Sequence, residues 1–222
     1  MDRAIKPVPF VDLHRQYVSI KGEIDEAIAG VIAASAFVRG PYVERFEQEY
    51  AEAMDARHCV SCSDGTAALY IAMHALGVKP GDEVITTAHS WISTSETITQ
   101  LGALPVFVDT DPDTFTIDPA KIEEKITGRT VGIIPVHLYG QAADMDAVMS
   151  IARARNLWVV EDCAQAHLAT FGNNKVGHFG AIATWSFYPG KNLGAMGDAG
   201  AATTNDADLA RRMARFARHG AS

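Results

Sequence analysis

The sequence predicts an α/β fold in which helices flank a mainly parallel central sheet. Short apolar runs of strand length alternate along the chain with stretches of helical periodicity. These runs are apolar at almost every position, which is typical of parallel strands buried on both faces. With 222 residues the chain is long enough for one large domain, and we expect residues 1–222 to form it, with helices at its amino terminus.

Two amphipathic helices are expected ahead of the first strand. Residues 16–34 carry an apolar stripe at helical spacing, formed by Ile20, Ile24, Ile28 and Val31. Gly40-Pro41 then interrupts the chain, and a second helix follows with Val43, Phe46 and Tyr50 on one side. We interpret both helices as scaffold.

A strand, a turn and a helix are expected between His58 and Gly77. The turn falls at Asp64-Gly65, and the helix runs from Ala67 to Gly77. Free amides and the positive end of the helix dipole suit a phosphate at this start. The alternative is that Asp64 or Thr66 only caps the helix. The sequence lacks both G-x-x-x-x-G-K-[ST] and G-x-G-x-x-G, so it gives no support to the nucleotide-binding loops that carry those motifs.

The rest of the chain alternates strands with helices. Strands are expected at residues 83–87, 104–109, 130–137, 157–162 and 181–187. Asp144 caps a helix that is expected to extend to Asn156, and another helix is expected over residues 208–216.

Lys191 is the first candidate for chemistry. It follows the apolar strand 181–187 in a loop rich in proline and glycine, at a strand end where active-site groups of open α/β sheets gather. A lysine that forms a Schiff base must be partly desolvated so that its amine can be neutral. Ser186, at the end of the strand, offers a hydroxyl to an anion such as a phosphate. The alternative is a solvated surface charge.

Asp162 and Trp91 lie at the ends of two other expected strands. A carboxylate at the end of a buried strand can bind a ring nitrogen and keep it protonated, which makes a pyridine ring an electron sink. Asp162 could equally be a helix cap or a structural acid in a salt bridge. Trp91 could stack on an aromatic ring or belong to the core.

The three cysteines indicate neither a metal site nor a disulfide framework. Cys59 and Cys62 have C-x-x-C spacing, but no second pair of ligands follows at useful spacing. Small buried side chains in a reducing compartment are the better interpretation of this pair.

Composition excludes several classes of partner. The formal net charge is -8 and the sequence pI is about 5.4, which argues against nucleic acid or an anionic membrane. No apolar run approaches the length of a membrane span. We therefore expect a soluble cytoplasmic protein.

Three motifs occur in an order that resembles a known family. They are Gly65-Thr66-Ala67-Ala68-Leu69, Glu161-Asp162-Cys163-Ala164-Gln165-Ala166-His167 and Ser186-Phe187-Tyr188-Pro189-Gly190-Lys191-Asn192-Leu193-Gly194. Together they look like the DegT/StrS family of pyridoxal-phosphate-dependent nucleotide-sugar aminotransferases, of the aspartate-aminotransferase fold. The likeness extends from Phe10 to Gly220. Leu168 departs from it, because a small residue, usually glycine, commonly follows the Gln-Ala-His motif.

The resemblance implies a role for each matching residue. Lys191 would be the catalytic residue, forming the Schiff base with pyridoxal phosphate and then moving the proton between substrate and cofactor. Asp162 would pair with the ring nitrogen, Trp91 would stack on the ring, and Gln165 would lie near its phenolic oxygen or on the sugar side. The residues that would hold the phosphate are Gly65, Thr66, Ala67 and Ser186.

The resemblance also implies the reaction. Glutamate would give its amino group to the cofactor, and a nucleotide-linked keto sugar, with a preference for a 3-keto sugar, would then accept it in a homodimer. Related sugar dehydratases carry a histidine in place of the lysine, so Lys191 favours transamination. The smaller carboxyl-terminal domain of the family is not present in these 222 residues. The alternatives are therefore a truncated or non-catalytic cofactor-binding protein, or a related sugar dehydratase.

Overall fold

The computed structural model describes residues 7–221, which divide into two compact units, one ending at Glu44 and one beginning at Arg45. Each unit is described by itself. The expectation of one domain over residues 1–222 stays a prediction. Within the described residues, no helix combines the length and the apolar composition needed to cross a membrane.

The first unit consists mainly of helix α1 (Leu13–Ala33). It begins at Leu13 because the side chain of Asp12 accepts a hydrogen bond from the amide of Arg15, at 2.9 Å. The helix is kinked at Ile20, and of the four residues of the predicted apolar stripe Ile20 and Ile28 are exposed, at 41% and 45%, whereas Ile24 and Val31 are half-buried. Helix α2 (Pro41–Ala53) begins in this unit with proline at its first position, as expected.

The second unit is built on a seven-stranded sheet with the order β1-β9-β8-β5-β4-β2-β3. Its strands are β1 (His58–Cys62), β2 (Glu83–Thr87), β3 (Leu104–Val108), β4 (Thr130–Ile134), β5 (Trp158–Asp162), β8 (Ile182–Ser186) and β9 (Gly200–Thr204). The pairs from β3 to β8 are parallel, whereas β9 runs antiparallel to both β8 and β1. The prediction of a mainly parallel sheet flanked by helices is confirmed.

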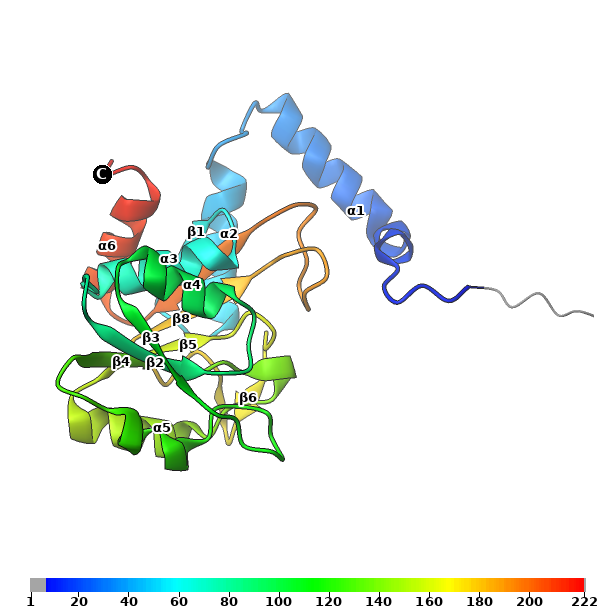
Figure 1. Ribbon diagram of the computed structural model, residues 1–222. Coiled ribbons are helices and arrows are strands. Elements are labelled where there is room, and N and C mark those ends of the chain that lie inside the picture. Colours follow the sequence, from blue (N-terminus) through cyan, green and yellow to red (C-terminus); the bar gives the residue numbers. More distant parts are fainter. Residues whose placement is uncertain (1–6, 222) are drawn as a thin grey trace, which may run out of the picture. The chain divides into compact units, whose positions relative to one another are not determined.

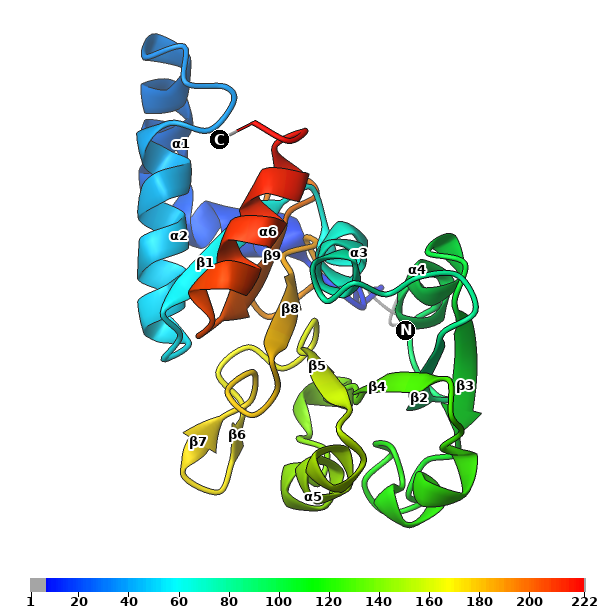
Figure 2. The same ribbon diagram turned by 90° about the vertical axis from the view of Figure 1, so that its left-hand side faces the viewer.

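Helices cover both faces of this sheet. Figure 1 shows α3 (Gly65–Ala75) and α4 (Ser93–Gln100) on one side and α5 (Met145–Arg155) on the other, and Figure 2 shows the same layers from the side. Side chains of α3, α4 and α6 (Ala207–Ala217) share one apolar cluster with Val84, Val160 and Ile182 of the sheet. Met145 and Val148 of α5 pack with Ile133 and Val159 of the opposite face.

Three kinds of element were not expected from the sequence. Strand β9 consists of Gly-Ala-Ala-Thr-Thr, which lacks the bulky apolar residues of the predicted strands. Helix α4 has the sequence Ser-Thr-Ser-Glu-Thr-Ile-Thr-Gln, whose many hydroxyl side chains disfavour a helix interior. The short elements are a hairpin, β6 (Thr170–Phe171) and β7 (Asn174–Lys175), and three 3₁₀ turns at Pro119–Lys121, Glu123–Lys125 and Leu138–Gly140.

The parallel strands end at one edge of the sheet. Because the carboxyl ends of β2, β5 and β8 meet there, the loops after them lie close to the start of α3. This edge holds the candidate site.

Candidate active site

A cavity of about 470 Å³ lies at this edge, within the usual range for small-molecule sites. It collects residues from the start of α3, the loop after β2 and the ends of β5 and β8. The residues predicted from the sequence that line it are Gly65, Thr66, Trp91, Asp162, Gln165, Ser186 and Lys191. The structure therefore brings these seven residues together.

The start of α3 forms one end of the cavity. Asp64 caps the helix by accepting a hydrogen bond from the Ala67 amide, at 2.7 Å. Helix geometry leaves the amides of Gly65 and Thr66 without an intrahelical acceptor. A methyl group on Gly65 would lie 2.7 Å from the Cβ of Ser186, so only glycine lets β8 approach this closely. The Asp64 cap is therefore present and leaves two amides at the helix start, and an anion site there stays a prediction.

Ala67 differs from the other predicted phosphate contacts. It lies one residue further into α3, it does not line the cavity, and its amide is already engaged by Asp64. A contact between Ala67 and a phosphate stays a prediction.

Asp162, at the end of β5, lines the cavity and is only 5% exposed. Its Oδ1 accepts from the Ala164 amide at 3.2 Å, and its Oδ2 accepts from the Thr94 hydroxyl at 2.9 Å. Burial raises the pKa of the Asp162 carboxyl, and these hydrogen bonds together with the charge of Lys191 oppose that rise. A carboxylate has about four acceptor positions, so Asp162 keeps acceptor capacity for a ligand.

Lys191 lies on the loop after β8, and its amide donates to the Tyr188 carbonyl at 2.8 Å. Its side chain is half-buried and lines the same cavity as Asp162. Desolvation lowers the pKa of Lys191 below the usual 10.5, while the nearby Asp162 carboxylate raises it. The amine therefore loses its proton more easily than a surface lysine, as a nucleophile requires.

Trp91 and Gln165 line the cavity from the loops that follow β2 and β5. Trp91 is 72% exposed, so the alternative that it belongs to the core is wrong. An indole that faces a cavity offers a flat surface for a ligand ring.

Sequence reasoning assigned no role to four hydroxyl residues that line the cavity, namely Ser90, Ser93, Thr94 and Tyr188. Ser90 and Thr94 line the cavity, and their hydroxyl oxygens lie 2.9 Å apart. Ser90 precedes α4 and Thr94 lies in its first turn, so no local sequence pattern marks the pair.

Leu168 adopts a left-handed backbone conformation, with φ of +63°, and is 60% exposed. This conformation favours glycine, which accounts for the small residue that commonly stands there in the resembled family. The departure lies outside the set of residues that line the cavity.

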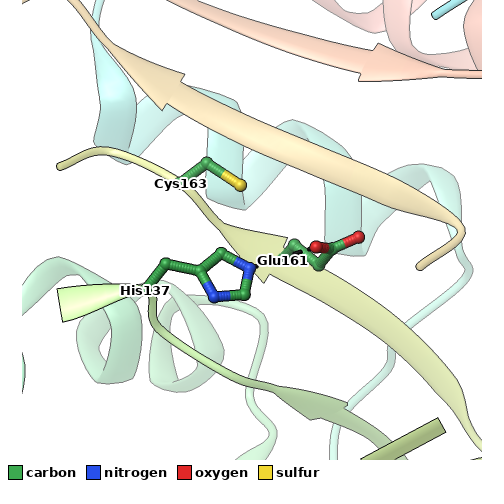
Figure 3. Close-up of side chains that lie close together, drawn as sticks. All are labelled: His137, Glu161 and Cys163. Carbon is green, nitrogen blue, oxygen red and sulfur yellow. Dashed lines mark hydrogen bonds and ion pairs between the residues drawn. The ribbon is translucent and has the colours of Figure 1, made fainter. Parts of the chain in front are cut away.

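A second polar cluster lies behind the site and consists of His137, Glu161 and Cys163 (Figure 3). Possible metal-ligating atoms of the three residues lie within 4.8 Å of one another. However, the Glu161 carboxylate already accepts hydrogen bonds from His137 Nε2 and from three backbone amides, those of Gly177, Phe179 and Gly180. Four N–H donors around a carboxylate leave little room for a cation, so we interpret the cluster as structural.

The C-x-x-C pair does not converge. Because side chains alternate along β1, Cys59 packs into the apolar cluster on one face of the sheet and Cys62 into the cluster on the other. Burial raises the pKa of both thiols, that of Cys62 to about 12. The interpretation of both cysteines as largely buried, unreactive side chains agrees with this geometry.

Comparison with known proteins gives a consistent match. The model of the DegT/DnrJ/EryC1/StrS aminotransferase family matches residues 18–222. The chain is 48% identical over 213 residues to a pleiotropic regulatory protein of Geobacillus stearothermophilus, covering 96% of the chain and 57% of that protein. It is 45% identical over 213 residues to UDP-2-acetamido-2-deoxy-3-oxo-D-glucuronate aminotransferase of Pseudomonas aeruginosa, covering 96% and 59%.

Solved structures match over nearly the whole chain. DesV of S. venezuelae, in complex with a ketimine intermediate, has a TM-score of 0.94 and 43% identity, covering 96% of this chain and 58% of that chain. NtdA of Bacillus subtilis, with bound cofactor PMP, has a TM-score of 0.88 and 38% identity, covering 97% and 49%. The chain thus spans a little more than half the length of the curated relatives it matches.

Proposed function

Because the chain belongs to the DegT/DnrJ/EryC1/StrS aminotransferase family, we propose that the protein is a pyridoxal-phosphate-dependent aminotransferase that moves an amino group from glutamate to a nucleotide-linked keto sugar. The observation that carries the proposal is a single cavity lined by a helix start with free amides, a buried carboxylate and a half-buried lysine. These are the three groups that a phosphorylated pyridine aldehyde needs.

The residues present fit this cofactor. The amides of Gly65 and Thr66 and the hydroxyl of Ser186 would hold its phosphate, at the positive end of the α3 dipole. The free acceptor positions of Asp162 would bind its ring nitrogen, and Trp91 would cover one face of the ring. When bound, pyridoxal phosphate supplies an electron-withdrawing ring that stabilises negative charge at the substrate carbon.

Lys191 has two roles in this proposal. Its amine, with a pKa lowered by desolvation, would hold the cofactor covalently by replacing the aldehyde oxygen, which would leave as water. As a free amine, the same group would act as the base that takes a proton from the substrate carbon and as the acid that returns it on the cofactor side. Gln165, on the loop after β5, would contact the phenolic oxygen or the sugar side.

The substrate class is supported by the relatives. The Pseudomonas aeruginosa aminotransferase is named for a 3-oxo sugar linked to UDP. We propose a 3-keto sugar for this protein as well, glutamate as donor, and a homodimer, as the family resemblance implies.

A second candidate is a protein that binds the cofactor without catalysing transfer. The regulatory protein of Geobacillus stearothermophilus, 48% identical, favours this possibility by its name. The two candidates share the cavity and differ in whether glutamate reacts.

Mixing the protein with pyridoxal phosphate and then with glutamate tests the proposal. We expect the visible absorption band of lysine-bound cofactor, and we expect glutamate to bleach it. A band that glutamate leaves unchanged would support the second candidate. Addition of a nucleotide-linked keto sugar then tests the alternative enzyme class, because loss of a sugar hydroxyl without formation of an amino sugar would indicate a dehydratase instead.

Lys191→Ala identifies the amine. This variant should lose the band and slow transfer by about 10²–10⁴-fold, the range of general acid–base catalysis. Lys79→Ala, which removes an exposed lysine that does not line the cavity, is the matched control and should keep both. Unchanged turnover in Lys191→Ala would overturn the mechanism.

A further inference from the structure

Thr94 makes the one side-chain hydrogen bond to Asp162 within the described residues. It lies in the first turn of α4, it is 1% exposed, and its Oγ1 is 2.9 Å from Asp162 Oδ2. An ionised carboxylate only accepts hydrogen bonds, so the Thr94 hydroxyl is the donor.

The Asp162 carboxylate fixes the direction of a short chain of hydrogen bonds that begins at Ser90. Because the single hydroxyl hydrogen of Thr94 is donated in the hydrogen bond to Asp162, Thr94 can only accept a hydrogen bond from Ser90, whose Oγ lies 2.9 Å away. The order is therefore Ser90 to Thr94 to Asp162, and each bond polarises the next toward the carboxylate. Both hydroxyl residues line the cavity, so the chain runs along its wall.

The other groups around Asp162 leave Thr94 a distinct task. The Ala164 amide binds Oδ1, while Lys191 acts on the carboxylate through its charge. Oδ2, in contrast, is held by Thr94. Without the Thr94 hydroxyl, the Asp162 carboxyl group could rotate about its side-chain bond, and Oδ2 could take up a proton.

We propose that Thr94 is a positioning residue that keeps the Asp162 carboxyl ionised and oriented toward the cavity, as the proposed function requires of a partner for a ring nitrogen. The direction of the Asp162 pKa agrees with this role: burial raises it, and the Ala164 and Thr94 bonds are the largest opposing influences. The role rests on the proposed aminotransferase function, but the hydrogen bond itself is measurable without cofactor.

Thr94→Val tests the proposal, because it replaces the hydroxyl with a methyl group of similar size. The readout is the titration of the Asp162 side-chain carbon by NMR in cofactor-free protein, with its signal assigned by its loss in Asp162→Asn. We expect the titration midpoint to rise by about one pH unit, the effect of losing one hydrogen bond to a charged group. Thr94→Ser, which keeps the hydroxyl, should restore the wild-type midpoint.

Thr97→Val is the matched control. Thr97 is also fully buried on α4, but its hydroxyl donates to the Ser93 carbonyl and not to Asp162. In Thr97→Val the titration midpoint of Asp162 should equal that in the wild type. If Thr94→Val does not fold, Ser90→Ala keeps the test open, since loss of the preceding donor should shift the midpoint in the same direction by less.

The outcomes separate this inference from the proposed function. An unchanged midpoint in Thr94→Val, a Thr94→Ser variant that behaves like it, or an equal shift in Thr97→Val would each overturn the positioning role. Failure of the wild-type protein to form the absorption band with pyridoxal phosphate would overturn the function, while the midpoints would still report on Thr94.

Discussion

Glu161 and Asp162 are neighbours at the end of β5, both almost fully buried, yet they are used in opposite ways. Glu161 is 0% exposed and accepts four hydrogen bonds of 2.7–3.0 Å from His137 and the loop of residues 177–180. Asp162, at 5% exposure, accepts two and faces the cavity. One acid is saturated by the protein, and the other keeps acceptor positions free.

The pleat of the strand produces this difference. Successive side chains point to opposite faces, so one carboxylate points into the protein and the next into the site. Burial alone does not distinguish a structural acid from a functional one. The number of hydrogen-bond donors already engaged does, and this suggests how each residue should respond to substitution.

Glu161→Gln should have the largest effect on stability. The side-chain amide has one oxygen, so some of the four N–H groups would face another donor in a buried site. We expect a loss of about 2–4 kcal/mol in the free energy of unfolding, from unsatisfied buried groups. Urea unfolding at neutral pH measures it, with Asp162→Asn as the matched control. Equal losses in the two variants would break the comparison.

The sequence predicted most of the sheet because each strand from β2 to β8 is marked by its own apolar residues, without reference to distant parts of the chain. Dense apolar runs and the caps at Asp64 and Asp144 depend only on near neighbours, and both caps are present. Lys191 and Asp162 could be placed at strand ends for the same reason. That they share one cavity followed from the rule that parallel strands end at one edge.

The remaining features depend on partners far away in the chain. Strand β9 is held by its pairing between β1 and β8, not by its own small residues. Thr94 meets Asp162 across 68 positions, and Glu161 meets His137 across 24. No local pattern distinguishes such a hydroxyl or imidazole from a solvated one, which is why the sequence showed the site but not what supports it.

Asp162→Asn should have a smaller effect that depends on pH. The pKa of Asp162 is raised above its ordinary 3.8, so the folded state binds the proton more tightly than the unfolded chain. Its contribution to stability is therefore fully present in acid, below the unfolded value, and is lost as pH rises through the raised folded value. The variant should match the wild type near pH 4 and gain up to about 1 kcal/mol at neutral pH.

Urea unfolding across this pH range would measure the difference. A variant that loses stability as the pH rises, relative to the wild type, would contradict the raised pKa. The same substitution should weaken the binding of pyridoxal phosphate by about tenfold or more, because it removes a charged hydrogen-bond partner. Asp162→Asn should therefore keep the stability of the folded protein and lose cofactor binding, whereas Glu161→Gln should lose stability.

Cys163→Ala should have an effect on stability as small as that of Asp162→Asn, and it tests whether the cluster of Figure 3 is structural. Cys163 is fully buried, and its truncation removes one sulfur atom, so we expect a cost of about 1 kcal/mol in thermal or urea unfolding. A chelator should leave the unfolding midpoint of both the wild type and the variant unchanged. If the chelator lowers the midpoint of the wild type but not that of Cys163→Ala, a metal ion rather than the surrounding amides satisfies Glu161. In that case Glu161 would not be satisfied by protein hydrogen bonds alone, and the contrast with Asp162 would be wrong.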